Sequence, residues 1–162
     1  MTRIARMRVV ILHESPGADE LRTSFVDAAE AFNRGLDIRL RFLDVGFSLR
    51  EVRVSDDDDF AAVTFSETQG AFVPGAVLAL GGGPRILECV SAAVKARLPV
   101  VYLAPAEPDA SARATARIAT VLVTSGPADA WPGIDTVALD GRPVGPALVD
   151  TIVRSVREDH RP

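Results

Sequence analysis

The chain contains few of the residues that most often mark chemistry. Its 162 residues include one cysteine, two histidines and one tryptophan, and aromatic residues make up 6% of the composition. A single cysteine, Cys89, excludes an internal disulfide framework and the cysteine-rich zinc motifs, and it is typical of a reducing compartment. We therefore expect a cytoplasmic protein.

The chain also lacks an excess of basic residues and any long apolar run. Its formal net charge is -4 and its pI is about 5.2, which leaves no broad basic face for nucleic-acid phosphates. Three arginines precede the apolar run 9–12, but that run is too short for a secretory leader or a membrane span. We expect no nucleic-acid partner and no membrane association.

What the chain does contain is enough apolar residue, 48%, for one compact core. Short apolar runs alternate with amphipathic segments, which predicts a single three-layer α/β domain over 1–162 with a central parallel sheet of four to five strands. The predicted strands are 9–13, 38–43, 72–80, 99–103 and 121–123, and the predicted helices are 18–34, 84–97, 111–119 and 146–157.

Two segments give less regular signals. Ser48 and Glu51 have the spacing of a capping box, and Ser55 before four aspartates is a second candidate helix start. Residues 125–146, which are rich in proline and glycine, predict a surface excursion around a short extended piece, 137–139.

The strongest candidate for chemistry is a histidine at the end of the first predicted strand. His13 follows the apolar run, and Asp44 follows the second predicted strand. Neighbouring parallel strands end at the same sheet edge, so we expect these side chains to converge there. An imidazole and a carboxylate are competent ligands for a divalent metal, or a base and its orienting partner. A loop histidine bonded to backbone and an acid capping a turn would give the same pattern.

A second candidate is the glycine run after the third predicted strand. Gly81, Gly82 and Gly83 precede a helix that has Pro84 at its start, and Arg85 lies close by. Such a loop offers backbone N–H groups to a phosphate or carboxylate, although glycine runs also simply make tight turns. Neither a Walker sequence nor the spaced dinucleotide-binding fingerprint is present.

The order of these motifs resembles that of the small sirohydrochlorin chelatases of the CbiX type. The likeness covers about 9–119 and rests on short motifs in the same order along both chains. They are His13-Glu14-Ser15 after a strand, Phe42-Leu43-Asp44, Ser48-Leu49-Arg50-Glu51-Val52, Phe72-Val73-Pro74 with Leu78-Ala79-Leu80, and the loop 104–109.

The resemblance implies a chelatase-like, flavodoxin-like fold for 9–119, with 120–162 as a C-terminal extension. It implies that a divalent metal, Co or Fe, is inserted as substrate into a tetrapyrrole, and that two copies pair to complete the cleft. His13, Asp44 and Glu14 would handle the metal, with His13 and Asp44 catalytic. Ser15, the glycine loop and Arg85 would bind the macrocycle. An active member would be a lyase.

Two positions depart from the family's pattern. Glu14 stands where the family has glycine, and Gly82 or Gly83 stands where it has a second metal-handling histidine. Loss of one nitrogen ligand weakens a metal site, which keeps two alternatives open. One is a non-catalytic ligand-binding or regulatory relative, and the other is a nucleotide- or phosphate-binding protein that uses the glycine loop.

Overall fold

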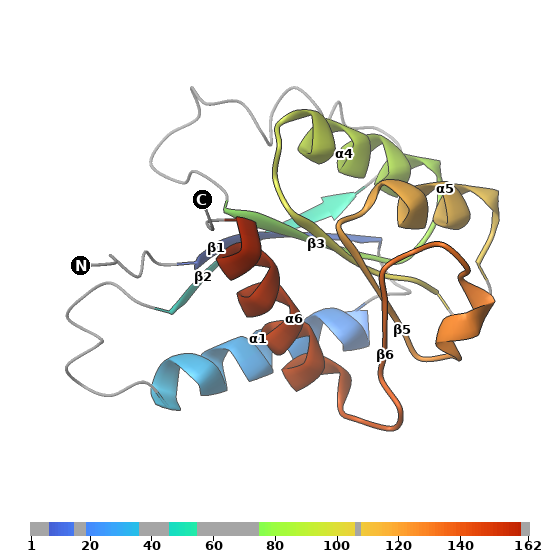
Figure 1. Ribbon diagram of the computed structural model, residues 1–162. Coiled ribbons are helices and arrows are strands. Elements are labelled where there is room, and N and C mark those ends of the chain that lie inside the picture. Colours follow the sequence, from blue (N-terminus) through green and yellow to red (C-terminus); the bar gives the residue numbers. More distant parts are fainter. Residues whose placement is uncertain (1–6, 15–18, 36–45, 55–74, 106–107, 160–162) are drawn as a thin grey trace.

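The computed structural model describes residues 7–14, 19–35, 46–54, 75–105 and 108–159 (Figure 1). Within these residues the chain forms one sheet and four α-helices. The strands are β1 (Met7–Glu14), β2 (Phe47–Val54), β3 (Ala76–Leu80), β4 (Val100–Leu103), β5 (Val121–Thr124) and β6 (Thr136–Ala138). The helices are α1 (Asp19–Gly35), α4 (Pro84–Lys95), α5 (Ala110–Ile118) and α6 (Val144–Asp159), with a 3-10 turn, η1 (Ala128–Ala130).

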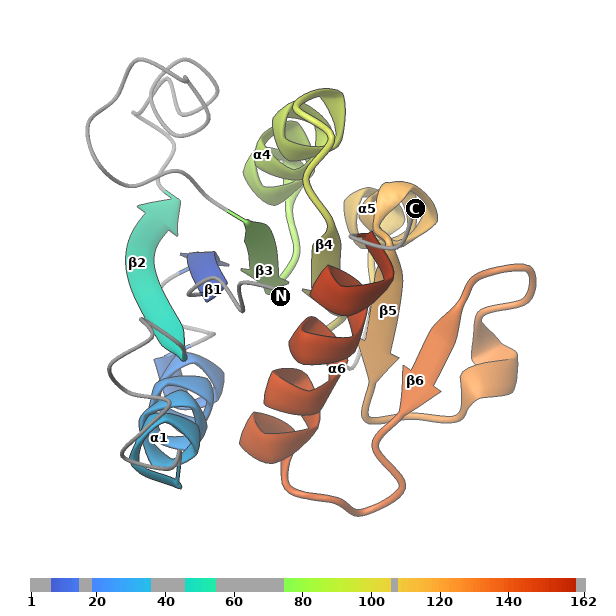
Figure 2. The ribbon, with the colours of Figure 1, turned by 60° about the vertical axis from the view of Figure 1, so that its left-hand side comes forward.

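The sheet has six parallel strands in the order β2-β1-β3-β4-β5-β6 (Figure 2). The first five follow the order of flavodoxin-like folds, and β6 extends the sheet at one edge. Crossovers between parallel strands are right-handed, so the connection from β1 to β2 and those from β3 to β5 must lie on opposite faces. Accordingly α1 covers one face and α4 and α5 cover the other.

The central strands are buried on both faces, as a parallel sheet between helices requires. Residues 9–12 of β1 and the whole of β3 are at most 1% exposed. Alternate residues point to opposite faces. Ile11 and Leu80 therefore pack toward α1 and α6, whereas Leu12 and Ala79 pack toward α4 and α5. Two apolar clusters, one on each face, result from this alternation.

Residues after 120 contribute to the same sheet and the same core. β5 and β6 add two parallel strands, and α6 returns across the face that α1 covers. Leu148 and Ile152 of α6 are fully buried there. The residues predicted as an extension therefore complete one of the two helical layers.

The three-layer parallel architecture confirms the predicted fold class. All four predicted helices are present, and the extended piece expected at 137–139 is the sixth strand, β6. Among the described residues no helix has the length and apolar character needed to cross a membrane.

The expectation of a helix start at Ser48 and Glu51 is wrong, because both residues lie inside β2. Tertiary contacts decide the conformation at this point. Asn33 at the end of α1 donates to the Phe47 carbonyl over 3.1 Å and accepts from the Phe47 N–H over 2.7 Å. The Phe47 ring packs edge-on against Phe25 and Phe32 of α1. The strand predicted at 38–43 and the helix start predicted at Ser55 lie outside the described residues.

Candidate functional site

The sheet has its topological switch point between β1 and β3. The chain leaves β1 toward the face that α1 covers and leaves β3 toward the face that α4 covers. In open α/β sheets the loops diverge at such a point and leave a crevice at the carboxyl ends of the two strands, where ligands bind. The geometry therefore singles out the ends of β1 and β3.

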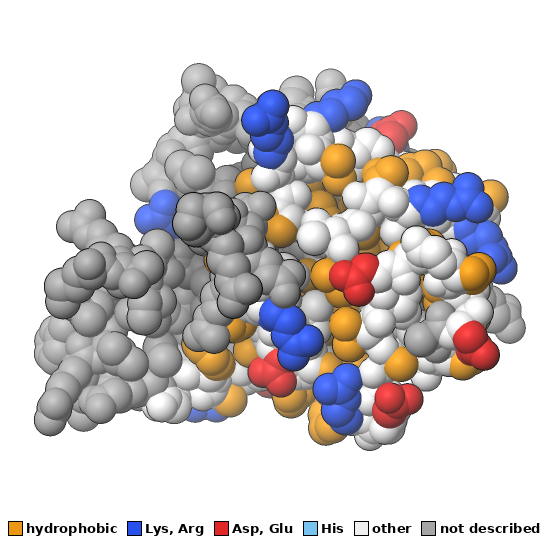
Figure 3. Space-filling model, viewed as in Figure 1, with side chains coloured by type: hydrophobic (Ala, Val, Ile, Leu, Met, Phe, Trp, Pro, Cys, Tyr) orange, Lys and Arg blue, Asp and Glu red, His pale blue; other side chains and the backbone are white. Residues whose placement is uncertain are grey.

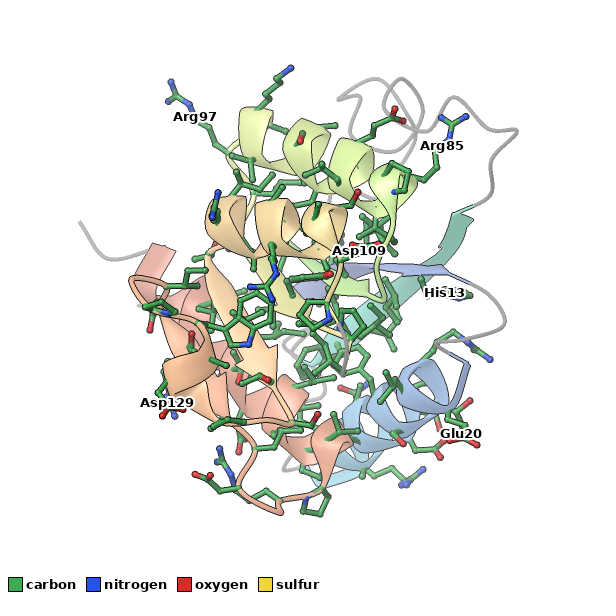
Figure 4. The ribbon with its side chains drawn as sticks, turned by 90° about the vertical axis from the view of Figure 1, so that its right-hand side faces the viewer. His13, Glu20, Arg85, Arg97, Asp109 and Asp129 are labelled. Atoms are coloured by element: carbon green, nitrogen blue, oxygen red, sulfur yellow. The ribbon has the colours of Figure 1, made fainter. Side chains whose placement is uncertain are left out.

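His13 lies at this point. It is the penultimate residue of β1, and its register partner in β3 is Leu80, the last residue before the glycine loop. Figure 4 shows His13 between Arg85 at the start of α4 and Glu20 at the start of α1. The residue is 6% exposed, so neighbouring residues cover most of its side chain.

The glycine loop has a conformation that only glycine adopts without strain. Gly81 has a φ of 99°, and Gly83 has a φ of 101° with a ψ of 163°. Side chains at such angles cost about 1–3 kcal/mol each. Gly82 has no such φ, but a Cβ there would lie 3.5 Å from Pro105 Cγ and 3.9 Å from an Asp109 carboxylate oxygen. The loop therefore lies against the beginning of α5.

The N-terminus of α4 follows the loop without a side-chain cap. Its N-cap residue is Gly83, Pro84 occupies the first turn, and no acidic residue lies in that turn. Arg85 donates to Glu88 over 3.1 Å, and both side chains are partly or largely exposed. The first turn thus combines uncapped backbone N–H groups with a positive side chain, which suits an anion.

Two side chains from neighbouring elements hold the loop in place. The Tyr102 hydroxyl, buried in β4, donates to the Gly81 carbonyl over 2.7 Å. Asp109, which lies beside Gly82, caps α5 by accepting from the Ala112 N–H over 2.7 Å. Asp109 could have been identified as a cap because an acid precedes a helical run, whereas no local pattern links Tyr102 to a carbonyl 21 positions away.

Among the predicted site residues, the structure places His13 beside the strand end from which the glycine loop continues, and Arg85 follows in the first turn of α4, where it contacts Glu88. Glu14 is the last residue of β1. Ser15 and Asp44 lie outside the described residues. The second described strand begins after Asp44, at Phe47, and the residues that follow this strand in the sequence are Ser55 and the aspartate run. No group of three metal-ligating side chains occurs among the residues that the structure describes.

Cys89, next to Glu88 on α4, belongs to the core. It is 1% exposed and lies among Ile86, Val90 and Ala93. Burial, reinforced by the charge of Glu88 and opposed by Arg85, raises the pKa of the Cys89 thiol from 9.0 to about 11. The thiol stays protonated near neutral pH and is no nucleophile there.

The strand order defines an architecture, the doubly wound α/β sheet, with its switch point between β1 and β3. Comparison with known proteins adds no narrower assignment: no protein-family model matches the chain, and no curated protein matches it.

Proposed function

We propose that the protein binds a carboxylated small molecule in the crevice between β1 and β3, with an anionic group of the ligand on the glycine loop and its reactive part near His13. The observation that carries this proposal is the adjacency of His13 to the strand end from which Gly81 to Gly83 continue. Uncapped N–H groups at the start of α4 and the Arg85 side chain would meet the carboxylate.

The ligand class that the resemblance of 9–119 suggests is a tetrapyrrole such as sirohydrochlorin, with Co²⁺ or Fe²⁺ as the second substrate. Insertion joins the metal ion to the four nitrogens of the macrocycle and releases two pyrrole protons, one of which would pass to water. His13 would accept the other proton, because a neutral imidazole is a base near pH 7. Asp44, Glu14 and Ser15 keep the roles that the resemblance gives them as parts of the proposal.

The proposal is tested by absorbance titration of the protein with sirohydrochlorin, alone and with Co²⁺. We expect saturable binding and a rate of cobalt insertion above that in buffer. His13→Gln, which approximates the size of the imidazole, should retain binding and lose the acceleration. His160→Gln, a change at the chain's other histidine, is the matched control and should keep both properties. Acceleration that survives His13→Gln contradicts the catalytic role.

A second candidate, binding of a phosphate or nucleotide, is favoured by the angles of Gly81 and Gly83 and by the uncapped start of α4. A panel of nucleotides and inorganic phosphate, used as competitors in the same titration, separates the two ligand classes. Tight nucleotide binding without any response to sirohydrochlorin would replace the tetrapyrrole proposal. Sirohydrochlorin binding without metal insertion would identify a non-catalytic relative.

Pairing of two copies remains part of the same proposal. Light scattering with and without sirohydrochlorin measures it, and a monomer that binds the macrocycle with unchanged mass would remove the need for a partner copy.

A further inference from the structure

A second surface feature lies on the other half of α5, away from the crevice. The connection from β5 to β6 contains only the turn η1, whereas the connections β1–β2, β3–β4 and β4–β5 carry the helices α1, α4 and α5. A hollow of about 130 Å³ results between this connection and α5. It is lined by Arg113, Arg117, Ala130, Trp131, Pro132 and Ile134.

The hollow is lined by two arginines and four apolar residues. Arg113 and Arg117 are four residues apart on α5, so they lie on the same helix face, where like charges repel. Figure 3 shows basic side chains gathered over α5. Within the described part of the chain neither arginine forms an ion pair with a carboxylate, although Asp129 is next to the lining residue Ala130. Two charges of one sign therefore border the same hollow.

Trp131 gives the hollow a fixed wall. Its side chain is 7% exposed and packs into the cluster beneath α4 and α5. The Arg113 Cζ lies 5.9 Å from the centroid of the indole ring, within the range of a cation–π contact. Stacking on a buried ring restricts the Arg113 guanidinium, which lowers the entropy that an incoming anion must overcome.

We propose that this hollow binds a small organic phosphate, with the phosphate between Arg113 and Arg117 and the organic group against Trp131, Pro132 and Ile134. A phosphate dianion suits two guanidiniums better than a singly charged carboxylate does. The apolar residues of the lining would contact an organic group on the phosphate. This site is separate from the crevice between β1 and β3.

Trp131 is the chain's only tryptophan, so its fluorescence reports on this hollow directly. The probe is phenyl phosphate, and inorganic phosphate, benzoate and benzyl alcohol are the comparisons. We expect a saturable change in Trp131 emission with phenyl phosphate, with an affinity at least about tenfold above each comparison. Affinity should fall as salt is added. Absence of a saturable change, or equal affinity for the uncharged alcohol or for inorganic phosphate, overturns the proposal.

Two variants test whether phenyl phosphate binds in this hollow. Arg117→Gln should weaken phenyl phosphate binding by about tenfold or more, since it removes one charge-assisted contact. Arg154→Gln, a change at an exposed arginine of α6, should leave the affinity unchanged. Circular dichroism checks that both variants fold. Equal affinities of the wild type and Arg117→Gln would overturn the proposal.

Discussion

The two faces of the sheet are built in different ways. The face that α1 and α6 cover is closed by large side chains, including Phe25, Phe47 and Leu148, and by direct helix contact. The face that α4 and α5 cover contains several small residues, such as Ala79, Ala93 and Ala112, and two larger aromatic ones. On the second face the two aromatic side chains, Tyr102 and Trp131, contact the glycine loop and line the hollow beside α5.

The aromatic residues of the two faces therefore have different expected roles, one in stability and the other in ligand binding. Tyr102 contacts the glycine loop and Trp131 lines the hollow, so the second face positions groups that a ligand could meet. The aromatic side chains of the first face pack against one another. Substitution of the packed aromatic residues of the first face should therefore cost free energy of unfolding, whereas substitution of Tyr102 or Trp131 should also affect binding.

The largest effect is expected from Phe47→Ala. Phe47 is 3% exposed and contacts two phenyl rings, with centroids 6.2 Å from Phe25 and 5.2 Å from Phe32. Its removal should lower the free energy of unfolding by about 3–5 kcal/mol. Denaturant titration measures the loss. The comparison is Ile86→Val on the other face, which should cost about 0.5–1.5 kcal/mol. A loss for Phe47→Ala that is smaller than the loss for Ile86→Val would reverse the ranking of the two faces.

The next effect concerns pH and Cys89 on the second face. The pKa of its thiol is about 11 in the folded state and ordinarily 9.0, so between these values the unfolded state binds fewer protons. The free energy of unfolding should therefore fall as pH rises from about 9 to 11, by at most about 3 kcal/mol from this group.

The contribution of Cys89 is isolated by comparison with Cys89→Ala, because tyrosine and lysine side chains also titrate in that range. The free-energy difference between the two proteins should change across this interval and stay constant below pH 8. A difference that is flat up to pH 11 would mean that the thiol ionises in the folded protein as it does in water.

A smaller loss is expected from Gly145→Ala, at a position where α6 lies directly against α1. A Cβ on Gly145 would meet the Ser24 carbonyl group, with its carbon at 2.9 Å, and the Ala28 Cβ at 3.1 Å. Separation of the helices should cost about 1–3 kcal/mol in thermal or denaturant unfolding. Gly35→Ala has open space around the new methyl group and should be neutral or slightly stabilising. Equal changes in the free energy of unfolding for Gly145→Ala and Gly35→Ala would show that the two helices can move apart freely.

The smallest stability effect, and the most informative one for the crevice, is that of Tyr102→Phe. Loss of the 2.7 Å hydrogen bond to the Gly81 carbonyl should cost about 1 kcal/mol and release the glycine loop from β4. Ligand affinity at the crevice should fall as well. Ser91→Ala removes a bond of similar kind, from Ser91 to the Leu87 carbonyl over 2.8 Å, and should lower stability without any effect on affinity.

Most of the fold could be predicted because local pattern and tertiary structure agree. The buried strands β1 and β4 are short apolar runs, and α4 begins with Pro84, which suits a first helical turn. At Ser48 the two disagree: a capping-box spacing favours a helix, but pairing with β1 and the packing of Phe47 on α1 produce a strand. No local pattern contains those distant contacts.

The candidate site was predictable only in part, for the same reason. A strand-end histidine and a glycine run can be read from the sequence, and the sheet order then makes them neighbours at the switch point. Tyr102 and the Arg113–Trp131 contact depend on register and on helix placement, which a single sequence does not encode locally.

The most direct test of the shared crevice is a two-dimensional NMR titration that follows the amides of Gly81 to Gly83 and the imidazole of His13 as sirohydrochlorin is added. We predict that these signals shift together and saturate with one dissociation constant, while the indole N–H of Trp131 does not move. Shifts confined to one of the two groups, or centred on Trp131, would contradict a common ligand site at the ends of β1 and β3.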